Sequence, residues 1–139
     1  MTAEFSLPIR VYIEDTDAGG IVYYVNYLKY LERARTDFMR SLGVDKAALP
    51  EADRMFVVSR VNVHYRTPAR LDDELVATLV LEQLGAATIE FAQSVRRGSE
   101  VLMEGTVEIA SVACSSGKPR RLSNELRARL EESGIGEIR

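Results

Sequence analysis

The spacing of apolar residues changes twice along the chain, and these changes limit the folds that it can adopt. Between residues 26 and 43, apolar side chains recur every three or four positions, as on one face of a helix: Tyr27, Leu31, Ala34, Phe38 and Leu42. Asn26 is the expected N-cap of this helix, and Gly43 is the expected stop at its C-terminal end. The sequence therefore predicts one long helix with a single apolar face.

Strand patterns flank this helix on both sides. A first strand is expected over 5–13, where Pro8 indicates a sheet edge or a strand start, and a polar loop follows over 14–20. After a loop around Pro50, four strands are expected: 55–66, 75–84, 88–97 and 101–114. Residues 67–74 are expected to form a turn, and tight hairpins are expected between the later strands. A short C-terminal helix capped by Ser123 would carry Leu126 and Leu130.

Alternation along residues 55–66 predicts two distinct strand faces. Every second residue would lie on the apolar face: Met55, Val57, Ser59, Val61, Val63 and Tyr65. His64, the sole histidine, would lie on the polar face with Arg60, Asn62 and Arg66.

The order of elements favours an α+β domain. Four hairpin-linked strands would form an antiparallel sheet with one apolar face, and the long helix would cover that face. A curved sheet wrapped around one helix leaves edges and part of a face uncovered, so self-association is expected. The length of 139 residues fits a single domain over 1–139.

Composition excludes several classes of function. Eighteen Lys and Arg residues against 21 Asp and Glu give a net charge of −3, so the chain as a whole is not expected to bind nucleic acid. The single cysteine, Cys114, excludes an intrachain disulfide and a cysteine-based metal cage. No apolar run is long enough to span a bilayer, and no signal peptide is recognised. We therefore expect a soluble, cytoplasmic protein without stable membrane insertion.

The segment just before the helix carries residues suited to chemistry. Asp17 precedes the pair Gly19-Gly20, which permits a close backbone approach, and the helix start then presents unpaired N–H groups. Acyl transfer needs such an arrangement, because a carboxylate can attack or activate water while amides stabilise the oxyanion. From position alone, a role for Asp17 in capping backbone N–H groups is the alternative. Asp15, two residues earlier, is assigned a structural role, and no metal site is predicted from this pair.

The sequence DAGGIVYYVNY at 17–27, followed by LERAR at 31–35, resembles the signature of the hotdog-fold acyl-CoA thioesterases. The similarity is to the 4-hydroxybenzoyl-CoA thioesterase family and its branch encoded beside the bacterial Tol-Pal system. Residues 65–74 and 118–122 also match that branch, so the resemblance covers nearly the whole chain.

This resemblance implies hydrolysis of acyl-CoA or acyl-carrier-protein thioesters without a metal or organic cofactor. It also implies a homotetramer, or at least a dimer, with active sites at subunit interfaces. Asp17 would be the catalytic carboxylate, acting as nucleophile or general base, and backbone amides near Tyr24 would form the oxyanion hole. Tyr24 is assigned to the catalytic site as well. The candidate substrate-binding residues are Gly20, Val25, Ser59, Arg66 and Arg97.

The sequence departs from the family pattern at two places. Tyr24 stands where many members of the Tol-Pal branch have His, and a phenol with a pKa of about 10 would mostly donate a hydrogen bond. The turn at 84–87 is uncharged, whereas relatives often carry basic residues there that hold the CoA phosphates. Phosphate binding is therefore expected either to be weak or to use other residues, such as Arg66, Arg70, Arg96, Arg97 or Lys118.

Two alternative functions follow from the same sequence. A hotdog dehydratase or hydratase would need a His and acid pair, but His64 lies within a strand pattern. A non-catalytic acyl-thioester-binding or scaffold protein would show no hydrolysis that depends on Asp17. The acyl group and the choice between CoA and acyl-carrier protein stay open.

Overall fold

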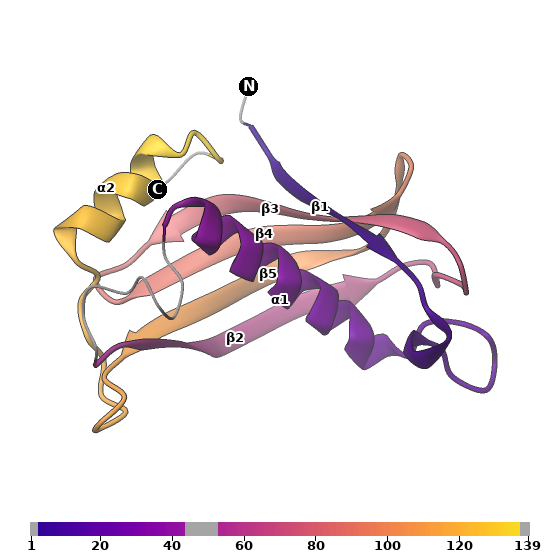
Figure 1. Cartoon of the computed structure of the whole chain (residues 1–139), viewed down its shortest axis with the longest axis horizontal. Coiled ribbons are helices and arrows are strands. Elements are labelled where there is room, and N and C mark those ends of the chain that lie inside the picture. Colours follow the sequence, from indigo (N-terminus) through magenta and orange to yellow (C-terminus); the bar gives the residue numbers. More distant parts are fainter. Residues whose placement is uncertain (1–2, 44–52, 137–139) are drawn as a thin grey trace.

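The computed structural model describes residues 3–43 and 53–136, so the loop predicted around Pro50 lies outside the described residues. The elements, in chain order, are β1 (Phe5–Arg10), the 3-10 helix η1 (Ile13–Asp15), α1 (Tyr24–Ser41), β2 (Met55–Tyr65), β3 (Glu74–Leu84), β4 (Thr88–Arg97), β5 (Glu100–Val112) and α2 (Asn124–Glu132). The five strands form one antiparallel sheet, and Figure 1 shows α1 lying across one face of it. The predicted α+β architecture is confirmed.

The strand order differs from the predicted run of four hairpin-linked strands. It is β1-β3-β4-β5-β2, so β2 pairs with β5 rather than with β3. Hairpins join β3 to β4 and β4 to β5 as predicted, but residues 66–73 are a crossover and not a tight turn. Turn residues predict that a chain reverses, but they cannot specify the strand with which it pairs next. Pro8 lies in β1 at a sheet edge, as its position indicated.

The core lies between α1 and the inner face of the sheet. The predicted stripe of Tyr27, Leu31, Ala34 and Phe38 is buried, and Leu42 packs against its margin. At the far end of α1, α2 covers the core with Leu126 and Leu130, as predicted. The predicted Ser123 cap is also confirmed, because its Oγ accepts a hydrogen bond from the Leu126 N–H at 3.1 Å.

Helix α1 begins two residues before the predicted N-cap. Asn26 lies inside the first turn, and its side-chain Nδ2 donates to the carbonyl oxygen of Asp15 at 2.8 Å. Asn26 therefore ties the preceding loop to the helix, and Tyr23 is the N-cap. At the other end, Gly43 has a φ of 81° directly after the helix, which confirms the predicted stop. The first strand ends at Arg10, earlier than the predicted residue 13, because the chain turns into η1.

A β-bulge in β2 overturns the predicted assignment of its faces. The register between β2 and β5 shifts between Val58 and Arg60, so Ser59 is an extra residue in the strand. Its Oγ donates to Oε1 of Glu108 at 2.8 Å, on the side of the sheet away from the apolar core. Ser59 is therefore not a member of an apolar face, since strict alternation cannot reveal an inserted residue.

The bulge also exchanges the faces of the residues that precede it. Opposite residues of paired strands point to the same side, and Val58 is paired with the buried Ile109. Val58 therefore shares the helix-facing side with Val61, Val63 and Tyr65. The residues on the outer face are Met55, Val57, Arg60, Asn62 and His64.

Candidate active site

The acidic segment before α1 forms a tight hairpin-like loop. Thr16 pairs with Val22, and the Asp17 N–H donates to the Ile21 carbonyl at 2.9 Å. The Gly20 N–H then donates to the Asp17 carbonyl at 3.1 Å, with Gly20 at a φ of 79°. This left-handed conformation favours glycine and makes the turn that places Asp17 at an exposed loop tip.

One carboxylate oxygen of Asp17 is held by the loop. Its Oδ1 accepts a hydrogen bond from the Gly19 N–H at 2.8 Å, while Oδ2 has no hydrogen bond to any residue in the described ranges. A Cβ atom at Gly19 would lie 3.2 Å from Oδ1, so a larger residue there would crowd the carboxylate. Glycine at this position thus orients the Asp17 carboxylate and leaves its second oxygen available.

The first turn of α1 presents free hydrogen-bond donors beside this loop. Tyr23 offers no side-chain cap, although its own N–H donates to the Asp15 carbonyl at 3.0 Å. The backbone N–H groups of Tyr24 and Val25 have no partner among residues 3–43 and 53–136. These two amides and the positive end of the helix dipole can stabilise negative charge on a carbonyl oxygen.

Asp15 holds the start of the loop through a buried hydrogen bond. Its side chain is buried, and its Oδ2 accepts a hydrogen bond from the Tyr12 N–H at 2.9 Å. Burial raises the pKa of the Tyr30 hydroxyl, and the nearby Asp15 carboxylate raises it further. The two neighbouring aspartates therefore differ in environment, because Asp15 is enclosed by the fold and Asp17 faces outward.

Tyrosine rings surround the start of α1. The Tyr65 hydroxyl, at the end of β2, donates to the Tyr24 carbonyl at 3.1 Å, and the two ring centroids are 6.0 Å apart in an edge-to-face arrangement. Tyr65 also packs edge-to-face on Tyr27 at 5.5 Å, and burial raises the pKa of Tyr65. Sequence reasoning did not assign Tyr65 to the site, although Tyr65 begins the segment 65–74 that resembles the family.

The crossover segment 66–73 braces the Asp17 loop from its other side. The Val22 N–H donates to the Ala69 carbonyl at 2.9 Å, and Ile21 pairs with Arg70. The Ala69 N–H in turn donates to the Tyr27 hydroxyl at 2.8 Å, within the core. Residues 21–22 therefore form the middle strand of a small three-stranded ladder, and the hydrogen bond to Tyr27 ties this ladder to α1.

The arginines predicted to bind substrate are paired with acidic residues. Arg97 contacts Oδ2 of Asp73 at 2.7 Å and Oε1 of Glu100 at 2.8 Å, and these hydrogen bonds raise its pKa. Burial alone would raise the pKa of Asp73, but hydrogen bonds from the Arg70 N–H and from Arg97 lower it overall. Arg66 has a looser contact of 3.5 Å with Glu104.

Ser59 lies far from this site within one chain. It precedes Tyr65 by six residues along β2, which corresponds to roughly 20 Å of strand. Gly20 and Val25, by contrast, lie in the loop and in the first helical turn, beside Asp17 and Tyr24. His64 is exposed on the outer face opposite Glu104.

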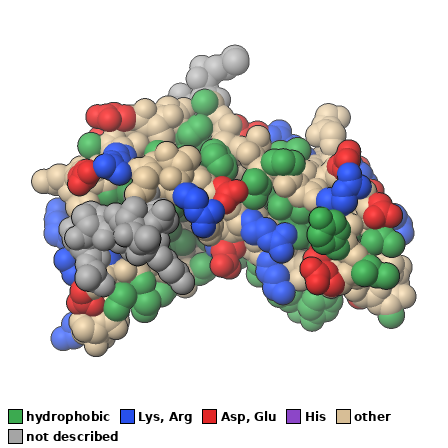
Figure 2. All heavy atoms as spheres, viewed as in Figure 1, with side chains coloured by type: hydrophobic (Ala, Val, Ile, Leu, Met, Phe, Trp, Pro, Cys, Tyr) green, Lys and Arg blue, Asp and Glu red, His purple; other side chains and the backbone are tan. Residues whose placement is uncertain are grey.

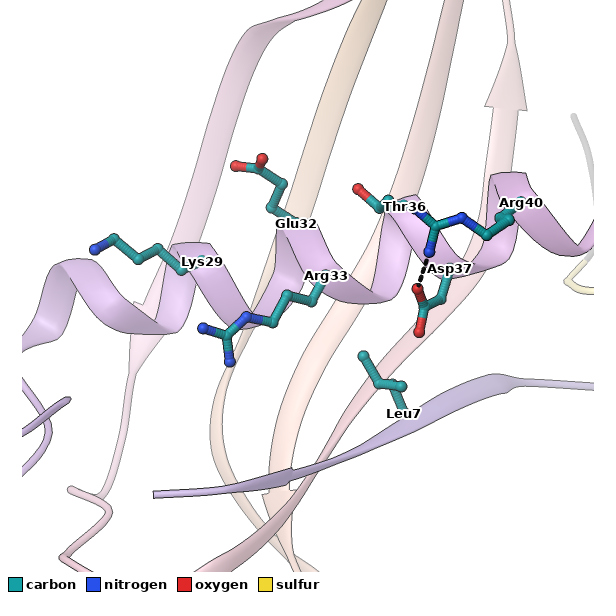
Figure 3. A pocket seen from close by; sticks show the side chains of 7 residues that line it. All are labelled: Leu7, Lys29, Glu32, Arg33, Thr36, Asp37 and Arg40. Carbon is teal, nitrogen blue, oxygen red and sulfur yellow. Dashed lines mark hydrogen bonds and ion pairs between the residues drawn. The ribbon is translucent and has the colours of Figure 1, made fainter. Parts of the chain in front are cut away.

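An open groove of about 580 Å³ lies elsewhere, between the outer side of α1 and β1. Its lining is mostly charged: Leu7, Lys29, Glu32, Arg33, Thr36, Asp37 and Arg40 (Figure 3). Arg40 and Asp37, one turn apart on α1, form an ion pair of 3.1 Å within this lining. Neither Asp17 nor any tyrosine of the cluster lines this groove.

Exposed apolar side chains gather around the Asp17 loop and along β2: Tyr12, Ile13, Tyr23, Tyr24, Met55, Val57, Val58, Val61, Tyr65 and Leu71. Figure 2 shows exposed hydrophobic side chains on the end of the molecule where α1 begins. Val58 is 51 % exposed although it points to the helix side of the sheet. An apolar inner face left open at a sheet edge is suited to contact with another protein surface.

Among residues 3–43 and 53–136, no group of three or more His, Cys, Asp and Glu side chains is placed to hold a metal ion. Within the same ranges, no helix is long and apolar enough to cross a membrane.

Comparison with known proteins identifies relatives over most of the chain. The family model described as the thioesterase superfamily matches residues 19–107. The acyl-CoA thioesterase YbgC of Haemophilus influenzae is 40% identical over 125 residues, covering 89% of this chain and 92% of the relative. The acyl-CoA thioester hydrolase YbgC of Escherichia coli O157:H7 is 36% identical over 132 residues, covering 94% and 98%.

Solved structures give the same result for the fold. A probable thioesterase from Bartonella henselae has a TM-score of 0.83 and 34% sequence identity, covering 87% of this chain and all of that one. A 1,4-dihydroxy-2-naphthoyl-CoA thioesterase from Synechocystis has a TM-score of 0.84 at 18% identity, covering 94% of this chain and 97% of that one. The second match supports the fold alone.

Proposed function

The chain belongs to the thioesterase superfamily and is a hotdog-fold thioester hydrolase, and we propose that Asp17 is its catalytic carboxylate and that acyl-CoA thioesters are its substrates. The observation that carries this proposal is that a carboxylate with one unbonded oxygen precedes a helix start whose backbone N–H groups are also unbonded. Oδ2 of Asp17 and the N–H groups of Tyr24 and Val25 have no hydrogen-bond partner among the described residues.

In the proposed reaction, the thioester carbonyl oxygen accepts hydrogen bonds from the Tyr24 and Val25 amides. These amides are fixed by the helix, so they stabilise the oxyanion without rearrangement. The carbon–sulfur bond then breaks and the thiolate leaves, which is feasible near neutral pH because a thiol has a pKa of about 8.5. No triad is therefore required for this leaving group.

Asp17 can act by either of two routes. As a nucleophile, its Oδ2 bonds to the carbonyl carbon, the thiolate leaves, and water hydrolyses the resulting anhydride. As a general base, it takes a proton from water as the hydroxide bonds to the carbon, and the proton passes to the thiolate. A single turnover in ¹⁸O-labelled water that places solvent oxygen in Asp17 and leaves the product acid without label would establish the anhydride route, because the general-base route puts one solvent oxygen into every molecule of product acid.

The proposed substrate pocket is completed by residues around the first turn of α1. Gly20 allows the thioester to approach the loop, and Val25 and the Tyr24 ring would line the acyl group. The Tyr24 hydroxyl can donate a hydrogen bond to substrate where a histidine would titrate. Arg66 stays a candidate for phosphate contact, since its only ion pair is loose.

We also propose a homodimer formed through β2. This strand has 11 residues and, within the described part of the chain, pairs only with β5, with Val58, Val61 and Tyr65 exposed on its helix side. Two such edges joined antiparallel about a two-fold axis would continue the sheet and cover those side chains. In a register that set Ser59 of one subunit near the Tyr65 end of the other, Ser59 could reach the site. A tetramer, a cytoplasmic location and a link to the Tol-Pal system stay predictions.

Thiol release from short aliphatic, long aliphatic and aromatic acyl-CoAs tests the proposed function. Asp17→Asn keeps the shape of the side chain and should lower the rate by roughly a hundredfold or more. Glu14→Gln is the matched control, because Glu14 is exposed three residues earlier and should be dispensable. Equal rates for Asp17→Asn and wild type would exclude Asp17 as the catalytic group. Binding of acyl-CoA without hydrolysis by folded protein would favour the non-catalytic alternative.

A further inference from the structure

Arg70 lies beside the Asp17 loop with an unpaired guanidinium. Its backbone N–H donates to Oδ2 of Asp73 at 2.8 Å, but its exposed side chain makes no hydrogen bond or ion pair with any residue in the described part of the chain. The other arginines near this end differ, because Arg97 is held by two carboxylates and Arg66 by one.

The backbone fixes the position of Arg70 relative to the catalytic carboxylate. Asp17 is hydrogen-bonded to Ile21, and Ile21 is paired with Arg70, so the three residues lie on adjacent strands of one ladder. Two strand spacings place the Cα atoms of Asp17 and Arg70 about 10 Å apart. Ala69, the preceding residue, is fully buried and bonded to Tyr27, so this segment is firmly anchored.

Asp73 forms no ion pair with the Arg70 guanidinium, although the charge of Arg70 helps to lower the pKa of Asp73. Oδ2 of Asp73 accepts both the Arg70 N–H and Nη1 of Arg97, and the Arg97 guanidinium balances the charge of Asp73. The guanidinium of Arg70 therefore stays available to an anion that arrives with the substrate.

The turn between β3 and β4 cannot supply such a cation. Its residues are uncharged, and its Gly85 carbonyl accepts a hydrogen bond from Arg127 of α2 at 2.8 Å. The Ala86 carbonyl likewise accepts the Leu122 N–H at 2.9 Å. This turn is thus occupied in packing against the C-terminal segment.

We propose that Arg70 binds a phosphate group of coenzyme A and so gives the enzyme its preference for CoA thioesters. The inference rests on the proposed function, and it selects one residue from the several arginines that the sequence offered. A guanidinium can form two parallel charge-assisted hydrogen bonds to a phosphate. The pantetheine arm carries the phosphates away from the thioester, and Arg70 lies at the rim of the site rather than at its centre.

The test compares two substrates with the same acyl group, an acyl-CoA and the corresponding acyl-pantetheine thioester, which has no phosphate. Arg70→Ala should raise KM for the acyl-CoA about tenfold, the scale of one charge-assisted hydrogen bond, and leave kcat nearly unchanged. KM for the acyl-pantetheine should not change. The acyl-CoA KM of the wild type should also rise with ionic strength, and that of the variant should rise less.

Arg60→Ala is the matched control, because Arg60 is also exposed and unpaired within the described residues but lies on the outer face of β2. It should leave both KM values unchanged. If Arg70→Ala affects both substrates equally, or neither, the phosphate contact is refuted while the proposed function stands. If wild-type protein hydrolyses neither thioester, the proposed function itself fails, and this inference fails with it.

Discussion

The two ends of α1 differ in whether their terminal backbone groups are hydrogen-bonded. At the C-terminal end, the Leu42 carbonyl accepts a hydrogen bond from Nη1 of Arg129 in α2 at 2.8 Å. The Gly43 N–H donates to the Arg40 carbonyl at 2.9 Å as the chain leaves the helix. Some of the carbonyl groups that lack a partner at the end of a helix are thus hydrogen-bonded, by α2 and by the glycine turn.

At the N-terminal end, donors are left open instead. The cap residue Tyr23 supplies no side-chain acceptor, and the Tyr24 and Val25 amides point away from any partner in the described ranges. A cap of Ser, Thr or Asp would stabilise the helix by typically about 1 kcal/mol but would occupy these amides. One helix end is therefore closed by packing, and the other end presents the free amides that the proposed reaction would use. Substitutions at the two ends should therefore separate stability from activity.

The largest effect is expected from Gly19→Val at the open end. The new Cβ would lie 3.2 Å from Oδ1 of Asp17, so the carboxylate would have to shift away from its present position. A misplaced catalytic group can lower kcat on the order of a hundredfold. Steady-state kinetics measures this loss, and the thermal midpoint should change little because the loop is exposed.

Ala18→Val places the same side chain one residue earlier in the exposed loop. It should retain most of the activity. A Gly19→Val enzyme with the wild-type rate would show that the orientation of Asp17 does not depend on Gly19.

At the C-terminal end of α1, Gly43→Ala is expected to lower stability and leave activity unchanged. At a φ of 81° an alanine costs roughly 1–2 kcal/mol, and its Cβ would come within 2.8 Å of Nη1 of Arg129. Urea unfolding should therefore show a lower free energy of unfolding, while kcat and KM stay as in the wild type. Gly117→Ala is the matched control, since Gly117 has a φ of 71° and open space around it. A Gly43→Ala variant that is less destabilised than Gly117→Ala would contradict the proposed role of the Arg129 contact.

Features of the fold that depend on nearby residues could be predicted from the sequence. The apolar stripe of α1, the stop at Gly43 and the Ser123 cap each involve residues a few positions apart, and each is confirmed. The pairing of β2 with β5 and the bulge at Ser59 depend on distant strands, so neither could be predicted. Tertiary contacts also decided against the Asn26 cap, because the Asp15 carbonyl, 11 residues away, takes its side chain.

The candidate site divides in the same manner. The position of Asp17 before a glycine pair and a helix is a local pattern, and the structure places all three together as expected. The contact of Arg97 with Asp73 spans 24 residues, and no pattern in the sequence indicates it. The unpaired state of Arg70 depends on that contact, so it too could only be recognised from the structure.

The smallest effect is expected from Tyr65→Phe, which tests whether the open end of α1 is held in place by β2. The substitution removes the 3.1 Å hydrogen bond to the Tyr24 carbonyl and keeps the rings that pack on Tyr24 and Tyr27. A neutral hydrogen bond contributes about 1 kcal/mol, so a loss of roughly fivefold in kcat is expected. KM should stay unchanged, because the bond is expected to position the Tyr24–Val25 peptide, which carries the Val25 N–H, and not to contact the substrate.

Tyr23→Phe is the control, since the Tyr23 hydroxyl bonds to no residue in the described part of the chain and its ring lies 5.0 Å from that of Tyr24. A loss of kcat in Tyr65→Phe alone would indicate that the edge strand sets the geometry of the free amides. Because β2 is also the proposed dimer edge, such a result would link the strand used for assembly to the geometry of the proposed active site. Equal rates for both variants and the wild type would instead mean that the helix start is held by its own loop, through Asp15 and Asn26.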